Sequence, residues 1–202
     1  MLEAMTDFAP CNIAFKEWAS ICTALAAGGQ TIILRKGGIA EEGDRFRAEH
    51  PRFWLYPTEF HQAEDQLRPE AAEYFPAARE LAPRDGRLPL GLFCEVAGVH
   101  VFREDDWPRI EALQPLHFWT VETICKRFDY RKPGLTLLAV RVYRRPLAHA
   151  LVVTPEYDGC RTWVTLHDAL SADHLQPVFD DTTFAAELAR LKHLVPALSE
   201  IA

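Results

Sequence analysis

The chain has 202 residues, of which 49% are hydrophobic and 25% charged, and its formal net charge is −7 at neutral pH. This length and composition are typical of one folded domain that buries its own core, and they exclude a disordered or fibrous chain. A nucleic-acid-binding surface spread over the whole molecule would be basic, so any contact with phosphates has to come from a local group of cations.

The cysteines and the N-terminus indicate the compartment. Five cysteines are scattered along the chain without a C-x-x-C pair, which is typical of reduced thiols and not of a disulfide framework or a zinc site. Glu3 and Asp7 stand where a signal peptide would carry lysines, and no apolar run approaches the ~20 residues that span a bilayer. We expect a cytoplasmic protein without a membrane segment or a bound metal, and the sequence indicates neither a cofactor nor an oligomeric state.

The first third of the chain predicts two helices and two strands. Apolar residues at helical spacing predict a helix over 13–26, which Gly28 and Gly29 end. Strands are predicted over 30–36 and within 46–58, where aromatic and aliphatic residues crowd positions 53–56. A second helix is predicted over 68–82, divided by Pro76. The charged, glycine-bearing segment 38–48 is expected to be the least ordered.

The rest of the chain predicts further strands and helices. Residues 90–104 resemble two short strands around Ala97 and Gly98, and strands are also predicted over 135–146 and 160–166. Helices are predicted from Asp105, over 119–129 and near the C-terminus. Because the two kinds of element are mixed without a regular βαβ repeat, we expect an α+β fold with a mixed, mainly antiparallel sheet flanked by helices. We expect one domain over 1–202, with a division into 10–66 and 88–202, joined by the helix 68–82, as the alternative.

Several runs resemble a known family. They are AFKEWA at 14–19, ILRKGGI at 33–39, EH at 49–50 and FWLYPTEFHQ at 53–62. Together they resemble a bacterial family known as domain of unknown function 1802, and the resemblance is most specific over residues 14–62. It implies a bacterial, cytoplasmic protein and implies no activity.

A weaker resemblance is to Nudix hydrolases, through RELAPRDGR at 79–87 and RTWVTLHDAL at 161–170. The two glutamates that hold the metal in that family would fall on Pro83 and Arg84, so this chain lacks the oxygen ligands that Mg²⁺ requires. The resemblance therefore implies at most a degenerate Nudix-like fold. The phosphate-binding loop G-x-x-x-x-G-K-[ST], the nucleophile motif G-x-S-x-G and the zinc motif H-E-x-x-H do not occur.

The stretch TIILRKGGI at 31–39 carries two cations and two glycines. Strand alternation points Arg35 and Lys36 to opposite faces, so at most one of them faces a given site. The amides of Gly37 and Gly38 could form a small anion-binding nest, or the two glycines could only turn the chain.

Polar residues surround the aromatic strand that follows. Alternation places Trp54 and Tyr56 on one face and Phe53 and Leu55 on the other. The candidate acid–base or ligand groups of a catalytic site are Glu49, His50, Glu59 and His61. The alternative interpretation is a buried strand whose flanking polar groups satisfy loop backbone.

The segment 125–145 is locally basic. It holds seven cationic residues and a single acid, with aromatic residues between them. Cations can contact phosphates while aromatic rings stack on bases, and the candidate ligand-binding residues here are Arg131, Lys132, Arg141 and Tyr143. The alternative is a helix end that favours cations, followed by an edge strand protected by charge.

Three functional hypotheses follow. The first is a module that binds a phosphate-bearing ligand, a nucleotide or nucleic acid, through Arg35, Lys36, Gly37, Gly38, Tyr56 and the basic segment. The second is a phosphoesterase or nuclease-type hydrolase that uses Glu49, His50, Glu59 and His61. The third is a non-enzymatic subunit of a larger assembly. They are separated by whether residues 35–38, 49–61 and 126–145 converge on one concave site.

Overall fold

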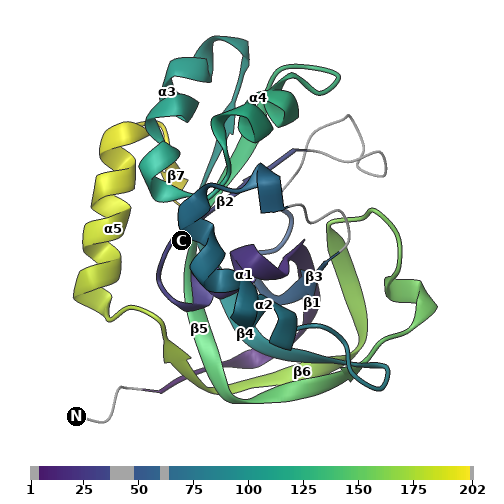
Figure 1. Cartoon of the computed structure of the whole chain (residues 1–202). Coiled ribbons are helices and arrows are strands. Elements are labelled where there is room, and N and C mark those ends of the chain that lie inside the picture. The colour runs from purple at the N-terminus through teal and green to yellow at the C-terminus, as the bar shows by residue number, and fades with distance from the viewer. Residues whose placement is uncertain (1–4, 37–47, 60–63, 201–202) are drawn as a thin grey trace.

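The computed structural model describes residues 5–36, 48–59 and 64–200. Its strands form one sheet in the order β2-β5-β6-β1-β3-β4-β7 (Figure 1). The strands are β1 (Thr6–Trp18), β2 (Ile32–Arg35), β3 (Arg52–Thr58), β4 (Arg87–Phe102), β5 (Leu135–Val152), β6 (Trp163–Pro177) and β7 (Ser199–Glu200). The helices are α1 (Ala19–Ala26), α2 (Phe75–Glu80), α3 (Trp107–Ala112), α4 (Val121–Asp129) and α5 (Asp181–Leu194). The expected α+β fold with a mainly antiparallel sheet is confirmed.

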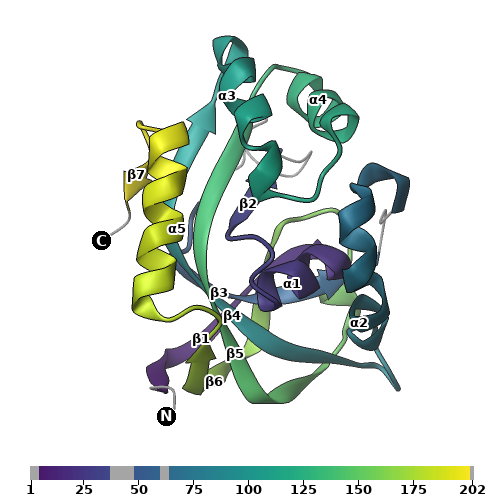
Figure 2. The same cartoon turned by 60° about the vertical axis from the view of Figure 1, so that its left-hand side comes forward.

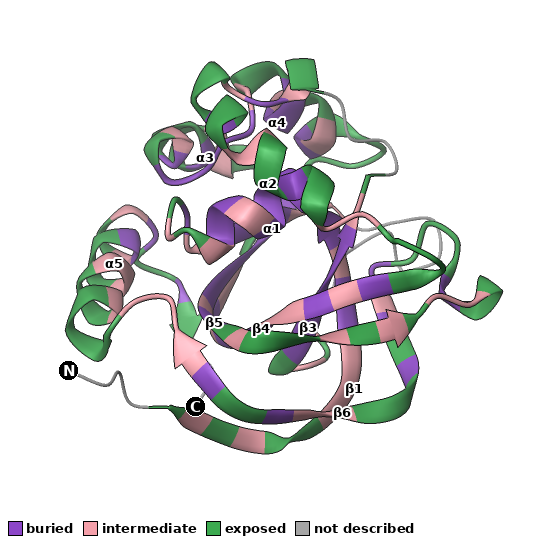
Figure 3. Ribbon diagram, turned by 60° about the horizontal axis from the view of Figure 1, so that its bottom comes forward, coloured by how far each residue is buried: buried purple, intermediate pink, exposed green. Residues whose placement is uncertain are grey.

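The sheet closes on itself. Strands β5, β6, β1, β3 and β4 follow one another, and β4 pairs in turn with β5, so these five strands form a ring that is visible in Figure 3. β1 and β3 run parallel, with Trp18 opposite Thr58 at their carboxyl ends, while the other described strand pairs are antiparallel. The carboxyl ends of β1 and β3 therefore meet at one edge of the ring.

The helices cover different sides of this ring. α1 lies with α2 across one side, α3 and α4 stand together at one end, and α5 lies beside β7 on another side (Figures 1 and 2). Among the described residues no helix is both long and apolar enough to span a membrane.

The core is divided between the two faces of the sheet, as the alternation along β3 predicts. Phe53 and Leu55 belong to the larger apolar cluster, which also packs the helices. Trp54 and Tyr56 belong to a second cluster together with Phe93, and all five of these side chains are buried. Strand alternation thus assigns neighbouring residues to different surroundings.

The structure corrects three predicted elements. Residues 13–18 are strand and not helix, because β1 is held between β6 and β3 and only the part from Ala19 onward is helical. Residues 90–104 are not a hairpin: β4 continues through Gly98, where a register shift against β5 marks a bulge. The strand predicted over 160–166 begins at Trp163 and continues to Pro177.

The predicted division of the helix at Pro76 is close to what is observed. Residues Pro69–Tyr74 form a 3₁₀ helix, and α2 follows from Phe75. Strands from 10–66 and from 88–202 alternate within the single sheet.

Candidate functional site

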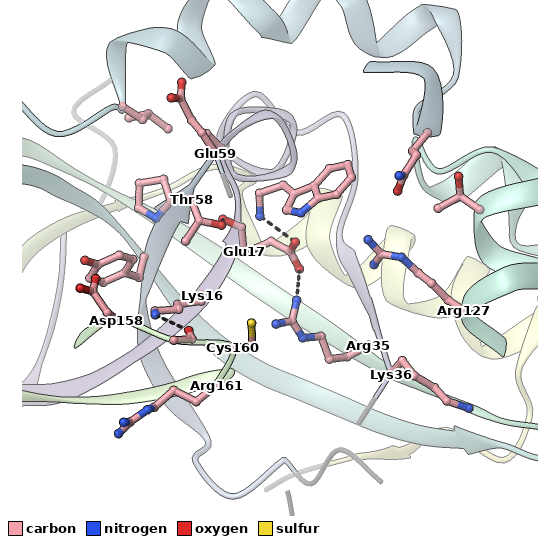
Figure 4. A pocket seen from close by; sticks show the side chains of 18 of the residues that line it. Lys16, Glu17, Arg35, Lys36, Thr58, Glu59, Arg127, Asp158, Cys160 and Arg161 are labelled. Carbon is pink, nitrogen blue, oxygen red and sulfur yellow. Dashed lines mark hydrogen bonds and ion pairs between the residues drawn. The ribbon is translucent and has the colours of Figure 1, made fainter. Parts of the chain in front are cut away.

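A cavity of about 970 Å³ opens where β1 and β3 end (Figure 4). Its walls come from the carboxyl ends of β1, β2 and β3, from α4 and from the segment that precedes β6. Cavities of about 300–1,000 Å³ are typical of small-molecule sites, which often lie outside the carboxyl ends of parallel strands. The lining residues used below are Lys16, Glu17, Trp18, Arg35, Lys36, Tyr56, Thr58, Glu59, Lys126, Arg127, Tyr157, Asp158, Cys160 and Arg161.

A buried carboxylate, that of Glu17, lies at the wall of the cavity. Glu17 is only 2% exposed, and its Oε1 accepts a hydrogen bond from the Trp18 backbone N–H at 2.8 Å. Its Oε2 lies 3.6 Å from Nη1 of Arg35. Because an unpaired buried charge is costly, this ion pair explains how a carboxylate is retained here.

Arg35, at the end of β2, is fixed from two sides. Besides the contact with Glu17, its Nε and Nη2 lie 3.3 and 3.2 Å from the Thr162 hydroxyl and donate to it. The guanidinium also lies over the Phe15 ring, 5.3 Å from its centroid. Arg35 is therefore held in one place with its charge balanced by Glu17.

Arg127 is different, because no described carboxylate forms an ion pair with its guanidinium. Its Cζ lies over two indole rings, 3.7 Å from the Trp119 centroid and 5.3 Å from that of Trp18. No described residue accepts a hydrogen bond from this guanidinium. Burial lowers the pKa of Arg127 to about 10, against a smaller opposing effect of Glu17, so the side chain stays cationic at neutral pH.

The position of Arg127 follows from α4. Thr120 caps the helix by accepting a hydrogen bond from the Thr123 N–H at 3.2 Å, and Ile124 and Phe128 are buried. Thr123 and Arg127 are one helical turn apart and so share the face that lines the cavity.

Lys36 lines the cavity but its ammonium group is used structurally. It donates to the carbonyls of Phe128 and Gly134 at 2.9 Å each, and to that of Lys132. These carbonyls follow from the end of α4, where helix termini leave acceptors unsatisfied. Lys36 thus ties β2 to the loop between α4 and β5.

A second group of side chains lines the cavity around Tyr56. Lys16 donates to the Gly159 carbonyl at 2.9 Å, and its ammonium lies 5.7 Å from the centroid of the Tyr56 ring. The rings of Tyr56 and Tyr157 are 6.4 Å apart and nearly perpendicular. Burial lowers the pKa of Lys16 and raises the pKa of Tyr56.

The sequence model of one family matches residues 14–190 of the chain. The protein belongs to DUF1802, described as a domain of unknown function. The resemblance noted in the sequence is confirmed.

Solved structures that resemble this DUF1802 protein include crystal structures of an ASCH protein from Zymomonas mobilis. The wild-type structure has a TM-score of 0.43 and 10% identity over 94% of this chain and 97% of that one. A point mutant has a TM-score of 0.43 and 12% identity, and covers 78% of this chain and 91% of that one. A likeness of this size supports no inference about function. No curated protein of similar sequence was found.

The Nudix-like resemblance is not supported. Residues 79–87 would have to form part of a long helix, but α2 ends at Glu80 and β4 begins at Arg87. Among the described residues, no group of three or more histidine, cysteine or acidic side chains could hold a metal ion.

The structure places the predicted site residues in several locations. Arg35, Lys36, Tyr56 and Glu59 line the cavity. Gly37, Gly38 and His61 lie outside the described residues. Glu49 is exposed and His50 packs against Trp163 at 5.0 Å between ring centroids, and neither lines the cavity.

The basic segment 125–145 divides at the end of α4. Lys126, Arg127 and Tyr130 line the cavity, whereas Arg131 and Lys132 lie in the exposed loop that follows and do not. Arg141 forms an ion pair with Asp181 of α5. Tyr143 is buried, donates to Glu95 Oε2 at 3.4 Å, and has its pKa raised to about 12 by burial. Arg141 and Tyr143 therefore lie away from the cavity.

Sequence reasoning missed several lining residues. Glu17 and Trp18 fall inside the segment predicted as helix, where their place at a strand end could not be seen. Residues 157–161 precede β6 and carry no motif. Arg127 belongs to the basic segment and lies eight residues after Trp119, but the second indole, that of Trp18, is distant in sequence. No local pattern therefore distinguishes Arg127 from its cationic neighbours.

Proposed function

We propose that the cavity of this DUF1802 protein binds a phosphate-bearing ligand, either a nucleotide or a segment of nucleic acid. The observation that supports this most strongly is the guanidinium of Arg127, which is half-buried against two indole rings, lines the cavity and finds no hydrogen-bond acceptor among the described residues. A partly desolvated guanidinium favours a bidentate anionic partner, and phosphate has the matching geometry.

The charge balance favours an anion. Glu17 and Arg35 neutralise each other within an ion pair, so Arg127 leaves one positive charge in excess at this end of the cavity. Lys126 and Arg161 also line the cavity, but Lys126 is paired with Glu122 at 2.6 Å, and Glu59, Asp65 and Asp158 add negative charge. Of the described lining residues six are cationic and five acidic, which leaves an excess of one positive charge. An uncompensated charge away from water is unfavourable, and a phosphate placed against Arg127 would relieve it.

The hydrolase alternative receives less support from the geometry. Of its four candidate groups only Glu59 lines the cavity, while Glu49 and His50 do not and His61 lies outside the described residues. No observation of the described residues favours an assembly subunit over a ligand-binding module. We therefore propose binding and not catalysis.

Salt dependence tests the proposal. The affinities of nucleoside mono- and triphosphates and of short single-stranded oligonucleotides would be measured by fluorescence or calorimetry between 50 and 200 mM salt, on the order of physiological ionic strength. We expect binding that weakens as salt rises, and much weaker binding of the nucleosides that lack a phosphate. Affinity that does not change with salt, or no binding of any phosphate compound, would overturn the proposal.

A further inference from the structure

The two groups of side chains in the cavity differ in kind. Around Arg127 the walls carry guanidinium groups and indoles. The group around Tyr56, called the Tyr56 end below, consists of Lys16, Tyr56, Tyr157, Asp158 and Cys160. In Figure 4, Lys16, Asp158 and Cys160 lie on one side of Glu17, and Arg127 and Lys36 lie on the other.

Strand alternation explains why the two ends differ. On β1, Ala14 belongs to the second core cluster and Phe15 to the larger one, so Lys16 and Glu17 continue these two faces in turn. Lys16 accordingly reaches Tyr56, a member of the second cluster, and Glu17 reaches Arg35. Adjacent residues of one strand thus supply the two ends of the cavity.

The Tyr56 end presents hydrogen-bonding groups beside two buried aromatic rings. Tyr56 and Tyr157 are only 7% and 3% exposed, so little of either ring face is open to a ligand and the polar groups decide what binds. The Tyr157 hydroxyl already has a partner, since it accepts a hydrogen bond from the backbone N–H of His167 at 2.9 Å. The Tyr56 hydroxyl and the Asp158 carboxylate find no hydrogen-bond partner among the described residues, so both are available to a ligand.

This combination selects among ligand chemistries. A second phosphate group would be attracted by Lys16 and Arg161, but it carries no donor for the Asp158 carboxylate, which can only accept. An aliphatic chain would leave the Tyr56 hydroxyl without a partner. A nucleobase satisfies both groups, because its edge carries donors and acceptors together.

We propose that the Tyr56 end is a nucleobase subsite, so that the ligand is a nucleotide unit with its phosphate at Arg127 and its base against Tyr56. This inference rests on the proposed function, since it requires a phosphate at the Arg127 end. The inference adds that the base contributes to affinity and that the Asp158 carboxylate accepts hydrogen bonds from donors on the edge of the base.

Competition between matched ligands tests the subsite. The probes are AMP, GMP, CMP and UMP, with ribose 5-phosphate as the ligand that lacks only the base. We expect at least one of the four nucleotides to bind at least about tenfold more tightly than ribose 5-phosphate, the effect of one or two hydrogen bonds to the base. If ribose 5-phosphate binds as tightly as all four, or if none of the five binds, the subsite is refuted. The proposed function fails as well only if triphosphates and oligonucleotides also do not bind.

Two substitutions refine this test. Asp158→Asn changes an exposed residue and should weaken the preferred nucleotide severalfold or change the preferred base, while ribose 5-phosphate binds as before. Asp105→Asn is the matched control, because Asp105 is exposed and does not line the cavity. Tyr56→Phe removes only the hydroxyl. If D158N and Y56F both leave the order and strength of nucleotide binding unchanged, the assignment is wrong.

The thiol of Cys160 provides a readout that needs no substitution. Cys160 is exposed and lines the Tyr56 end, whereas Cys125 lies on α4 outside the cavity. We expect the preferred nucleotide to slow alkylation of Cys160 by N-ethylmaleimide and to leave the rate at Cys125 unchanged, as followed by peptide mass spectrometry. Ribose 5-phosphate at saturation should leave Cys160 reactive. Unaltered reactivity of Cys160 in the saturated nucleotide complex would refute the subsite.

Discussion

Arg127 and Arg141 come from one basic segment and stand in opposite situations. Arg127 lies against two indole rings at a cavity, and no described residue accepts a hydrogen bond from it. Arg141 also lies over aromatic rings, those of Tyr143 and Phe184, but it is paired with Asp181 of α5. The comparison shows that a cation is informative about ligands only once its partners are known, because the fold had already supplied one for Arg141.

The largest effect that separates the two arginines is on ligand binding. Arg127→Gln should reduce affinity for a phosphate ligand by more than about 100-fold, because two hydrogen bonds to a charged group contribute about 3–6 kcal/mol together. Arg141→Gln should leave affinity within about twofold, since it lies away from the cavity. Calorimetric titration measures both, with thermal unfolding as the check on folding. Equal losses in the two variants would contradict the account.

Trp119, whose indole lies under Arg127, neighbours a buried histidine that should make the fold sensitive to acid. The backbone N–H of Trp119 donates to Nδ1 of His117 at 3.2 Å. Burial, helped by the charge of Arg68, lowers the pKa of His117 to about 4. As the pH falls, His117 of the unfolded chain is protonated near pH 6.5, whereas His117 of the folded protein stays neutral until about pH 4. The free energy of unfolding should therefore decrease by about 3 kcal/mol as the pH is lowered through this window.

Denaturant titrations between pH 7 and pH 4 measure this contribution. His117→Gln should remove about 1.4 kcal/mol per pH unit from the slope within that window. His193, which is exposed on α5, supplies the control His193→Gln. If H117Q and the wild type lose stability with the same slope, His117 is not the group responsible.

Lys36 sharpens the comparison, because it is a cation of the cavity wall that already has acceptors. Lys36→Met should lower the free energy of unfolding by about 2 kcal/mol, since it leaves the carbonyls of Phe128 and Gly134 without their charged donor. Lys132→Met is the matched control, as Lys132 is exposed and contributes its carbonyl. Chemical denaturation measures both, and a change in K36M as small as that in K132M would show that the tie is not stabilising.

The smallest effect on stability is expected for the ion pair between Arg141 and Asp181. The Asp181 side chain is 89% exposed, so its pairing with Arg141 is screened by water. Asp181→Asn should change the free energy of unfolding by no more than about 1 kcal/mol. A much larger loss would mean that Arg141 depends on this partner in the way that Arg35 depends on Glu17.

The fold class and the two faces of β3 could be predicted from the sequence, because strand alternation is local. The start of α1 could not. Apolar residues at 15, 18, 22 and 25 fit a helix, but Phe15 and Trp18 are fixed in β1 by neighbours on both sides, and pairing with distant strands outweighs local periodicity.

The site shows the same limit. Alternation predicted that Arg35 and Lys36 would separate, and they do: Arg35 contacts Glu17 and Thr162, while Lys36 turns to the end of α4. The sequence could not show that Glu17, at the end of β1, balances Arg35 while Arg127 finds no acceptor among the described residues. That arrangement depends on three elements meeting at one edge of the ring.

A crystal structure of the complex with the nucleotide that binds most tightly tests the central claim most directly. The account predicts a phosphate oxygen within hydrogen-bond distance of the Arg127 guanidinium, inside the cavity at the ends of β1 and β3. A nucleotide bound outside the cavity, with its phosphate at Arg141 or elsewhere and Arg127 uncontacted, would contradict it.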